Sequence, residues 1–153
     1  MRAALGLGAC LLVAAAGGCS TVDIGEPPAD VNACRPSQQY FYEQVCPNYL
    51  AASYGGKTCM DATCHGPSSM GSALRITLAS CTEDAPPTIP FVAGSNWFAS
   101  YLSTTQVMNC TDVTGAALYT KPSGLNSSHG GGKLFEPGGP EFTLLQQWVA
   151  PGP

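Results

Sequence analysis

The segment CMDATCHG, residues 59–66, holds the most informative pattern in this 153-residue chain. Two cysteines are separated by four residues, and His65 directly follows the second. A histidine in this position is typical of covalent haem attachment, in which two thiols bond to the porphyrin and the imidazole binds its iron. The usual spacing is C-x-x-C-H, so a wider loop has to bulge outward to serve the same purpose. The sequence therefore permits haem attachment through Cys59 and Cys64.

The same segment allows two other interpretations. Cys59 and Cys64 could close a short disulfide loop, which would leave His65 as an ordinary loop residue. Alternatively, the two cysteines and the histidine could bind zinc, but structural zinc sites use four ligands and the sequence offers no fourth at a convincing spacing. The haem and disulfide interpretations are the stronger two.

The N-terminus predicts export and attachment to lipid. Arg2 is followed by an apolar run, 3–16, and then by Gly-Gly-Cys. About 14 apolar residues are too few for a membrane span, which needs roughly 20, so the run indicates a secretory signal. The sequence AGGC, 16–19, resembles a bacterial lipobox, although its first position usually carries leucine. We expect a lipoprotein signal peptide at 1–18 and an acylated Cys19, with plain cleaved export as the alternative.

These features predict an exported lipoprotein of the bacterial cell envelope, periplasmic or on the outer surface, whose lipid anchor binds the membrane. Residues 19–38 have few large apolar side chains and are predicted to form a flexible tether. Residues 39–153 have a length that suits one domain. Six Lys and Arg against ten Asp and Glu argue against a nucleic-acid partner.

The cysteine count predicts disulfides. With the signal removed and Cys19 acylated, six cysteines remain, an even number that favours complete pairing in an exported chain. If Cys59 and Cys64 bind haem, four are left, and proximity in the sequence favours the pairs Cys34–Cys46 and Cys81–Cys110. Each bridge would stabilise the fold by about 2–4 kcal/mol.

Hydrophobic periodicity predicts a mainly helical domain with long loops. A helix is expected within 38–56, which Pro47 would end or kink near its middle. Further helices are expected at 95–105, capped by Ser95, and at 140–149, with a proline in the first turn.

Two shorter segments are less regular. Residues 72–80 alternate apolar and polar side chains around Leu74, Ile76 and Leu78, which indicates a brief strand or an extended segment. Residues 115–121 are expected to form a short helix or strand, and 123–139, which include His129, are expected to form a loop.

Together these pieces resemble the small c-type-cytochrome-like domains of exported planctomycete and myxobacterial (deltaproteobacterial) lipoproteins. The resemblance covers about 40–152. It rests on a first helix with the pattern F-x3-V-x-P-x2-L, then CHG, then AALYTK at 116–121, HGGGKLF at 129–135 and LLQQWVAPG at 144–152. The order and spacing of these elements carry the resemblance, because no single one is specific.

The resemblance implies a small cytochrome c-like helical domain that binds one haem c. Thioether bonds would come from Cys59 and Cys64, and His65 would be the proximal iron ligand. Many relatives carry a Met-Pro pair in the loop before the last helix, where this chain has His129, so His129 is the expected distal ligand. Met70 and Met108 are weaker alternatives. Ligation by two histidines would give a lower potential than ligation by His and Met.

The sequence thus predicts a lipid-anchored, mono-haem electron-transfer protein, rather than an enzyme, that exchanges electrons with exported redox partner proteins. The alternative is a haem-free, disulfide-stapled structural or interaction lipoprotein with a cytochrome-like frame. A haem enzyme that acts on peroxide is a third possibility, but no acid–base pair adjoins either histidine in the sequence.

Overall fold

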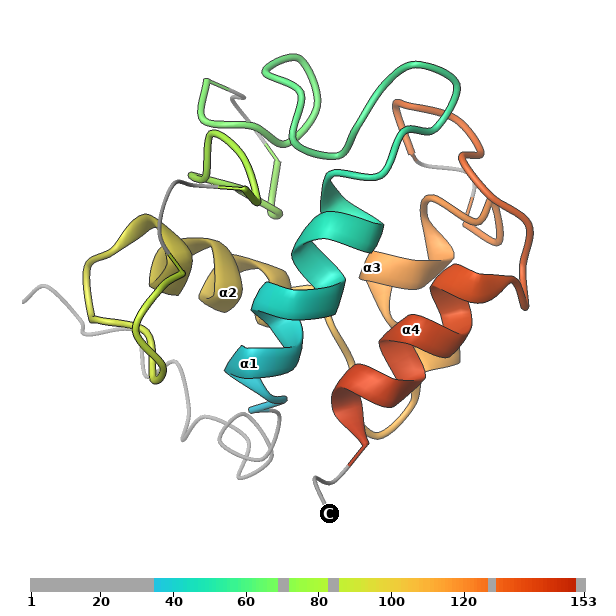
Figure 1. The fold of residues 1–153 in the computed structure, drawn as a ribbon. Coiled ribbons are helices and arrows are strands. Elements are labelled where there is room, and N and C mark those ends of the chain that lie inside the picture. Colours follow the sequence, from blue (N-terminus) through green and yellow to red (C-terminus); the bar gives the residue numbers. More distant parts are fainter. Residues whose placement is uncertain (1–34, 69–71, 83–85, 127–128, 151–153) are drawn as a thin grey trace, which may run out of the picture.

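The computed structural model describes residues 35–68, 72–82, 86–126 and 129–150 (Figure 1). Within these residues the regular elements are all helices, joined by long loops. They are α1 (Gln38–Tyr40), η2 (Phe41–Leu50), α2 (Asn96–Gln106), η3 (Val113–Gly115), α3 (Ala117–Thr120) and α4 (Pro140–Val149). The mainly helical fold class is therefore confirmed. In the part of the chain that the structure describes, no helix is long and apolar enough to cross a membrane.

Several predicted features fall outside the described residues. They are the signal peptide, the acylation site Cys19, most of the tether, Cys34 and Met70. The last tether residues are described and contact the domain: Tyr101 Oη donates a hydrogen bond to the carbonyl of Pro36 at 2.7 Å. Trp148 Nε1 donates to the carbonyl of Ser37 at 3.0 Å, and the Ser37 hydroxyl caps α1.

The first helix does not end at Pro47. α1 continues directly into η2, a π-helix whose wider turns carry the chain through Pro47 to Leu50. Bonding between residues five apart is seen where the amide of Ala51 donates to the carbonyl of Cys46 at 2.9 Å. The inward face of η2 is fully buried, and this burial outweighs the hydrogen bond that proline cannot donate.

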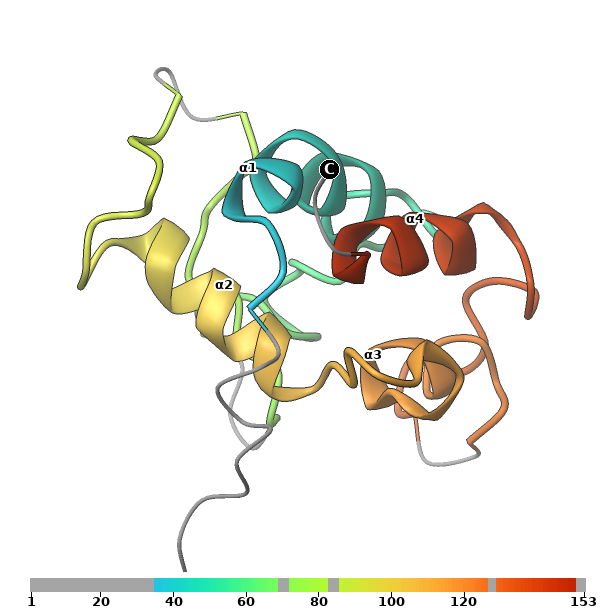
Figure 2. The same cartoon turned by 90° about the horizontal axis from the view of Figure 1, so that it is seen from below.

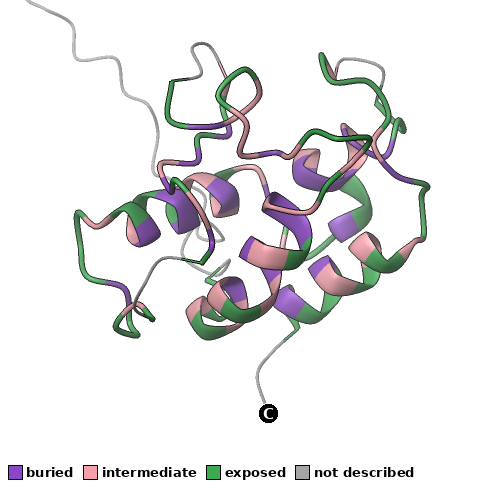
Figure 3. Ribbon diagram, turned by 45° about the horizontal axis from the view of Figure 1, so that its top comes forward, coloured by how far each residue is buried: buried purple, intermediate pink, exposed green. Residues whose placement is uncertain are grey.

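The core is built around Phe41 of η2. Its ring lies 5.6 Å from the rings of Tyr101 in α2 and Trp148 in α4, and 6.4 Å from that of Trp97 in α2. Figures 1 and 2 show α4 beside η2, and Figure 3 shows the buried residues on the inward faces of these helices. The sequence predicted α2 and α4. α2 begins after Ser95, whose hydroxyl accepts from the amide of Phe98 at 3.1 Å, and α4 has the predicted bounds.

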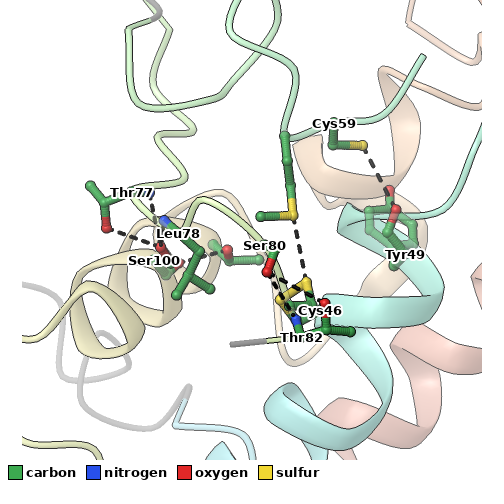
Figure 4. The surroundings of a disulfide bond; sticks show 11 residues. Cys46, Tyr49, Cys59, Thr77, Leu78, Ser80, Thr82 and Ser100 are labelled. Atoms are coloured by element: carbon green, nitrogen blue, oxygen red, sulfur yellow. Dashed lines mark hydrogen bonds between the residues drawn. A yellow bond between two sulfur atoms is a disulfide. The ribbon is translucent and has the colours of Figure 1, made fainter. Parts of the chain in front are cut away.

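The segment 72–80 is extended but forms no strand. Leu74, Ile76 and Leu78 are buried in the core, as their alternation predicted. The role of a partner strand is taken by hydroxyl groups of α2. The Ser100 hydroxyl accepts from the amide of Thr77 at 2.9 Å (Figure 4), and other α2 side chains add similar bonds.

The predicted disulfide pairs are wrong. Cys46 of η2 is bonded to Cys81, with their Cα atoms 5.6 Å apart, so neither Cys34–Cys46 nor Cys81–Cys110 exists. Cys110 is disulfide-bonded as well. The segment 72–82 returns to lie against η2 and brings together cysteines 35 positions apart, which proximity in the sequence could not reveal. Met60 Sδ lies 3.5 Å from Cys81 Sγ, so the bridge also contacts the loop between Cys59 and Cys64.

Candidate cofactor-binding pocket

The loop between Cys59 and Cys64 is a compact, hydrogen-bonded turn. The amide of Cys64 donates to the carbonyl of Asp61 at 2.8 Å, and the amide of His65 donates to the carbonyl of Cys59 at 3.1 Å. The Asp61 carboxylate accepts from the amide of Thr58 at 2.8 Å. This turn accommodates the four intervening residues and brings His65 back beside Cys59.

Gly66 is required by this turn. A Cβ atom at this position would lie 2.2 Å from the carbonyl oxygen of Met60 and 3.0 Å from the backbone of Asp61. Real Cβ atoms do not approach backbone so closely, so only glycine fits after His65 without a change in the loop. The glycine of the CHG pattern therefore has a steric cause.

Both cysteines of the pattern are free thiols, and no bond joins them. Cys59 is buried, and its Sγ lies 3.9 Å from the carbonyl oxygen of Tyr49 (Figure 4). Burial, with a smaller contribution from Cys64, raises the pKa of the Cys59 thiol to about 12. Cys64 is half-buried.

The imidazole of His65 is held through one nitrogen. Its Nδ1 lies 3.1 Å from the carbonyl oxygen of Leu74 and 2.7 Å from the hydroxyl of Ser72. A carbonyl can only accept, so Nδ1 carries the proton and Nε2 is left with the free lone pair. Burial lowers the pKa of His65, opposed by the Leu74 carbonyl and assisted by His129 and Lys121. The neutral form, which can bind a metal, is therefore favoured.

His129 is held in the same way. Its Nδ1 lies 2.7 Å from the carbonyl oxygen of Gly132, in the glycine-rich loop before α4. The bond again leaves Nε2 as the nitrogen with the free lone pair. Gly131 lies under the ring, where an added Cβ would be 3.1 Å from His129 Cε1.

The two imidazoles lie on one pocket. Their ring centres are 6.2 Å apart and their planes differ by 12°. The pocket is open to solvent on one side, and both histidines line it. Its lining includes Cys59 and the largely apolar surface of Tyr49, Leu74, Val107, Ala117, Leu118 and Pro122, together with Ser72, Ala73 and Lys121. Neither Cys64 nor Met108 is among the lining residues.

The arrangement of the two imidazoles fits a metal bound between them. A metal–imidazole bond is about 2 Å long and the ring centre lies about 1 Å behind the nitrogen, so two imidazoles that shared one metal would have ring centres no more than about 6 Å apart. The separation of 6.2 Å agrees with this. Carbonyl partners on Nδ1 are also the usual outer contacts of metal-binding histidines.

The zinc interpretation finds no such agreement. Among the described residues, which include Cys59, Cys64 and His65, no group of three or more His, Cys, Asp or Glu side chains could hold a metal ion. The described donors therefore do not complete a zinc site.

No family model, curated protein or solved structure matches this chain. The resemblance to c-type-cytochrome-like domains therefore stays a prediction from the sequence.

Some contributors to the pocket could not be identified from the sequence. The carbonyls of Leu74 and Gly132 belong to the backbone, which every residue carries. Lys121 stands in the AALYTK segment without any sign that it faces the histidines. Only the two histidines and Cys59 carried a recognisable chemical signal.

Proposed function

We propose that this protein is a c-type electron carrier with a cytochrome c-like fold, which binds one haem between His65 and His129. The observation that carries the proposal is the imidazole pair, 6.2 Å apart and 12° from parallel, with each Nδ1 bonded to a carbonyl. Cys59 and Cys64 would provide the thioether bonds. Both are free thiols, as such bonds require.

The residues of the pocket suit electron transfer better than catalysis. Haem, when bound, supplies a one-electron couple at its iron. His65 and His129 would both hold the iron, and two imidazole ligands would favour electron transfer at a low potential over binding of a substrate to the metal. The apolar walls would limit the contact of the ring with water, and the hydrogen bonds at Nδ1 would hold the two imidazoles in place when the charge changes.

We further propose that acylated Cys19 keeps the carrier at the membrane and that its partners are exported redox proteins. The support is the lipobox-like AGGC and the preceding apolar run. Metabolic labelling with a fatty acid should mark the wild type, and Cys19→Ser should abolish the label. A wild type that carries no label would contradict the anchor without affecting the haem proposal.

The experiment that tests the function is expression of the full chain in a host that attaches haem covalently. A pyridine haemochrome spectrum should show haem retained after denaturation, and the intact mass should show one haem adduct. His129→Ala should keep the adduct but change the spectrum from a six-coordinate to a five-coordinate or water-bound form.

The controls separate attachment from mere binding. Cys59→Ser and Cys64→Ser should each leave a single thioether link and shift the haemochrome band. A colourless wild type without adduct, from a host that loads another c-type cytochrome normally, would refute the proposal. It would leave the haem-free structural lipoprotein as the better hypothesis.

A further inference from the structure

We propose that Lys121 binds a carboxylate of the porphyrin, so that the pocket has an anion-accepting position beside the two histidines. This inference rests on the proposed haem function and adds a recognition residue to it. Protoporphyrin carries two carboxylates, which have to find either solvent or a cation when the ring enters a largely apolar pocket.

Lys121 occupies a fixed position at the pocket. It is the C-cap residue of α3, and its amide donates to the carbonyl of Ala117 at 3.3 Å. It is half-buried and lines the pocket together with His65 and His129.

The ammonium group has no acidic neighbour in the pocket. None of the described residues that line it is an aspartate or glutamate. Lys133, by contrast, forms an ion pair with Glu136. A half-buried lysine beside apolar walls can offer its ammonium group to an anionic group of a ligand. The pocket therefore lacks the anion that a carboxylate-bearing ligand would bring.

Lys121 also differs from the other described lysines in what surrounds it. Lys57 is exposed in a tight turn after η2 and does not line the pocket, and Lys133 is exposed and paired with Glu136. These two positions are therefore matched controls for the loss of a positive charge at Lys121.

The test compares ferric haem with its dimethyl ester, which lacks both carboxylates. The full chain is purified in detergent from a host without haem-attachment enzymes, and each ligand is titrated while the Soret band is followed. The wild type should bind the diacid about tenfold more tightly than the diester, as expected for one charge-assisted hydrogen bond at a half-exposed site. Lys121→Met should bind both forms equally, whereas Lys121→Arg and Lys57→Met should keep the preference.

The outcomes separate this inference from the proposed function. If the wild type binds haem with no preference for the diacid, or if Lys121→Met keeps the preference, Lys121 is not the carboxylate partner and the haem proposal stands. If neither form perturbs the Soret band in any variant, the haem proposal falls and this inference falls with it. Should Lys121→Met fail to fold, Lys121→Gln replaces it in the same comparison and should likewise lose the preference.

Discussion

Replacing Gly66 by alanine should destabilise the domain sharply, because the new methyl group has no space. The added Cβ would stand 2.2 Å from the carbonyl oxygen of Met60, which is backbone and cannot turn aside as a flexible side chain could. The loop must therefore shift. Overpacking of this kind costs about 1–3 kcal/mol, and loss of the Gly66 amide bond to Asp61 adds about 1 kcal/mol. We expect a total loss of about 2–4 kcal/mol in the free energy of unfolding.

Urea denaturation followed by tryptophan fluorescence measures this loss, since Trp97 and Trp148 are both buried. Gly130→Ala is the matched control, because an added Cβ there meets no atom within 4 Å. It should change the free energy by less than about 0.5 kcal/mol, as surface substitutions usually do. If Gly66→Ala is as stable as Gly130→Ala, Gly66 does not pack against the turn between Cys59 and Cys64, and the steric explanation for this glycine is refuted.

Three further predictions test other parts of the structure. Replacing both Cys46 and Cys81 by serine should lower the free energy of unfolding by about 2–5 kcal/mol in urea denaturation. Serine at either position alone should leave one additional thiol that alkylating reagents detect in the unfolded chain. A double variant as stable as the wild type would contradict the bridge. The free energy of unfolding of the haem-free chain should fall as the pH drops below about 6.5, because the pKa of His65 is lower in the folded state and the unfolded chain takes up the proton first. His65→Gln should reduce this pH dependence in urea denaturation. An equal pH dependence in the variant would refute the lowered pKa of His65. Ser100→Ala removes a fully buried hydroxyl that accepts from the amide of Thr77. It should lower the free energy of unfolding by about 1–3 kcal/mol and speed hydrogen exchange at that amide. Unchanged exchange would show that other contacts hold the extended segment.

The elements that the sequence predicted well depend on local signals. Ser95 caps α2 through a bond to an amide three residues away, and Pro140 suits the first turn of α4 because that turn needs no amide donor. The path through Pro47 depends instead on tertiary burial of η2, which favours a wider helical turn over an ending. The pairing of Cys46 with Cys81 likewise depends on where a distant segment packs.

The candidate site shows the same division. His65 and His129 could be predicted, because imidazole is rare in this chain and chemically distinctive. Their common orientation could not be predicted, since it follows from two backbone carbonyls and from the path that brings two distant loops onto one pocket. The position of Lys121 depends on where α3 ends and is equally invisible in the sequence.

The extended segment 72–82 holds His65 in place from two points. The carbonyl of Leu74 contacts the imidazole, and Cys81 attaches the segment to η2 through the disulfide. From Leu74 to Ala79, buried side chains alternate with exposed or half-buried ones. Deleting a single residue there would reverse that alternation, expose the leucines and withdraw the carbonyl from the ring. This stretch should therefore tolerate changes of residue type at its outward positions but no change of length.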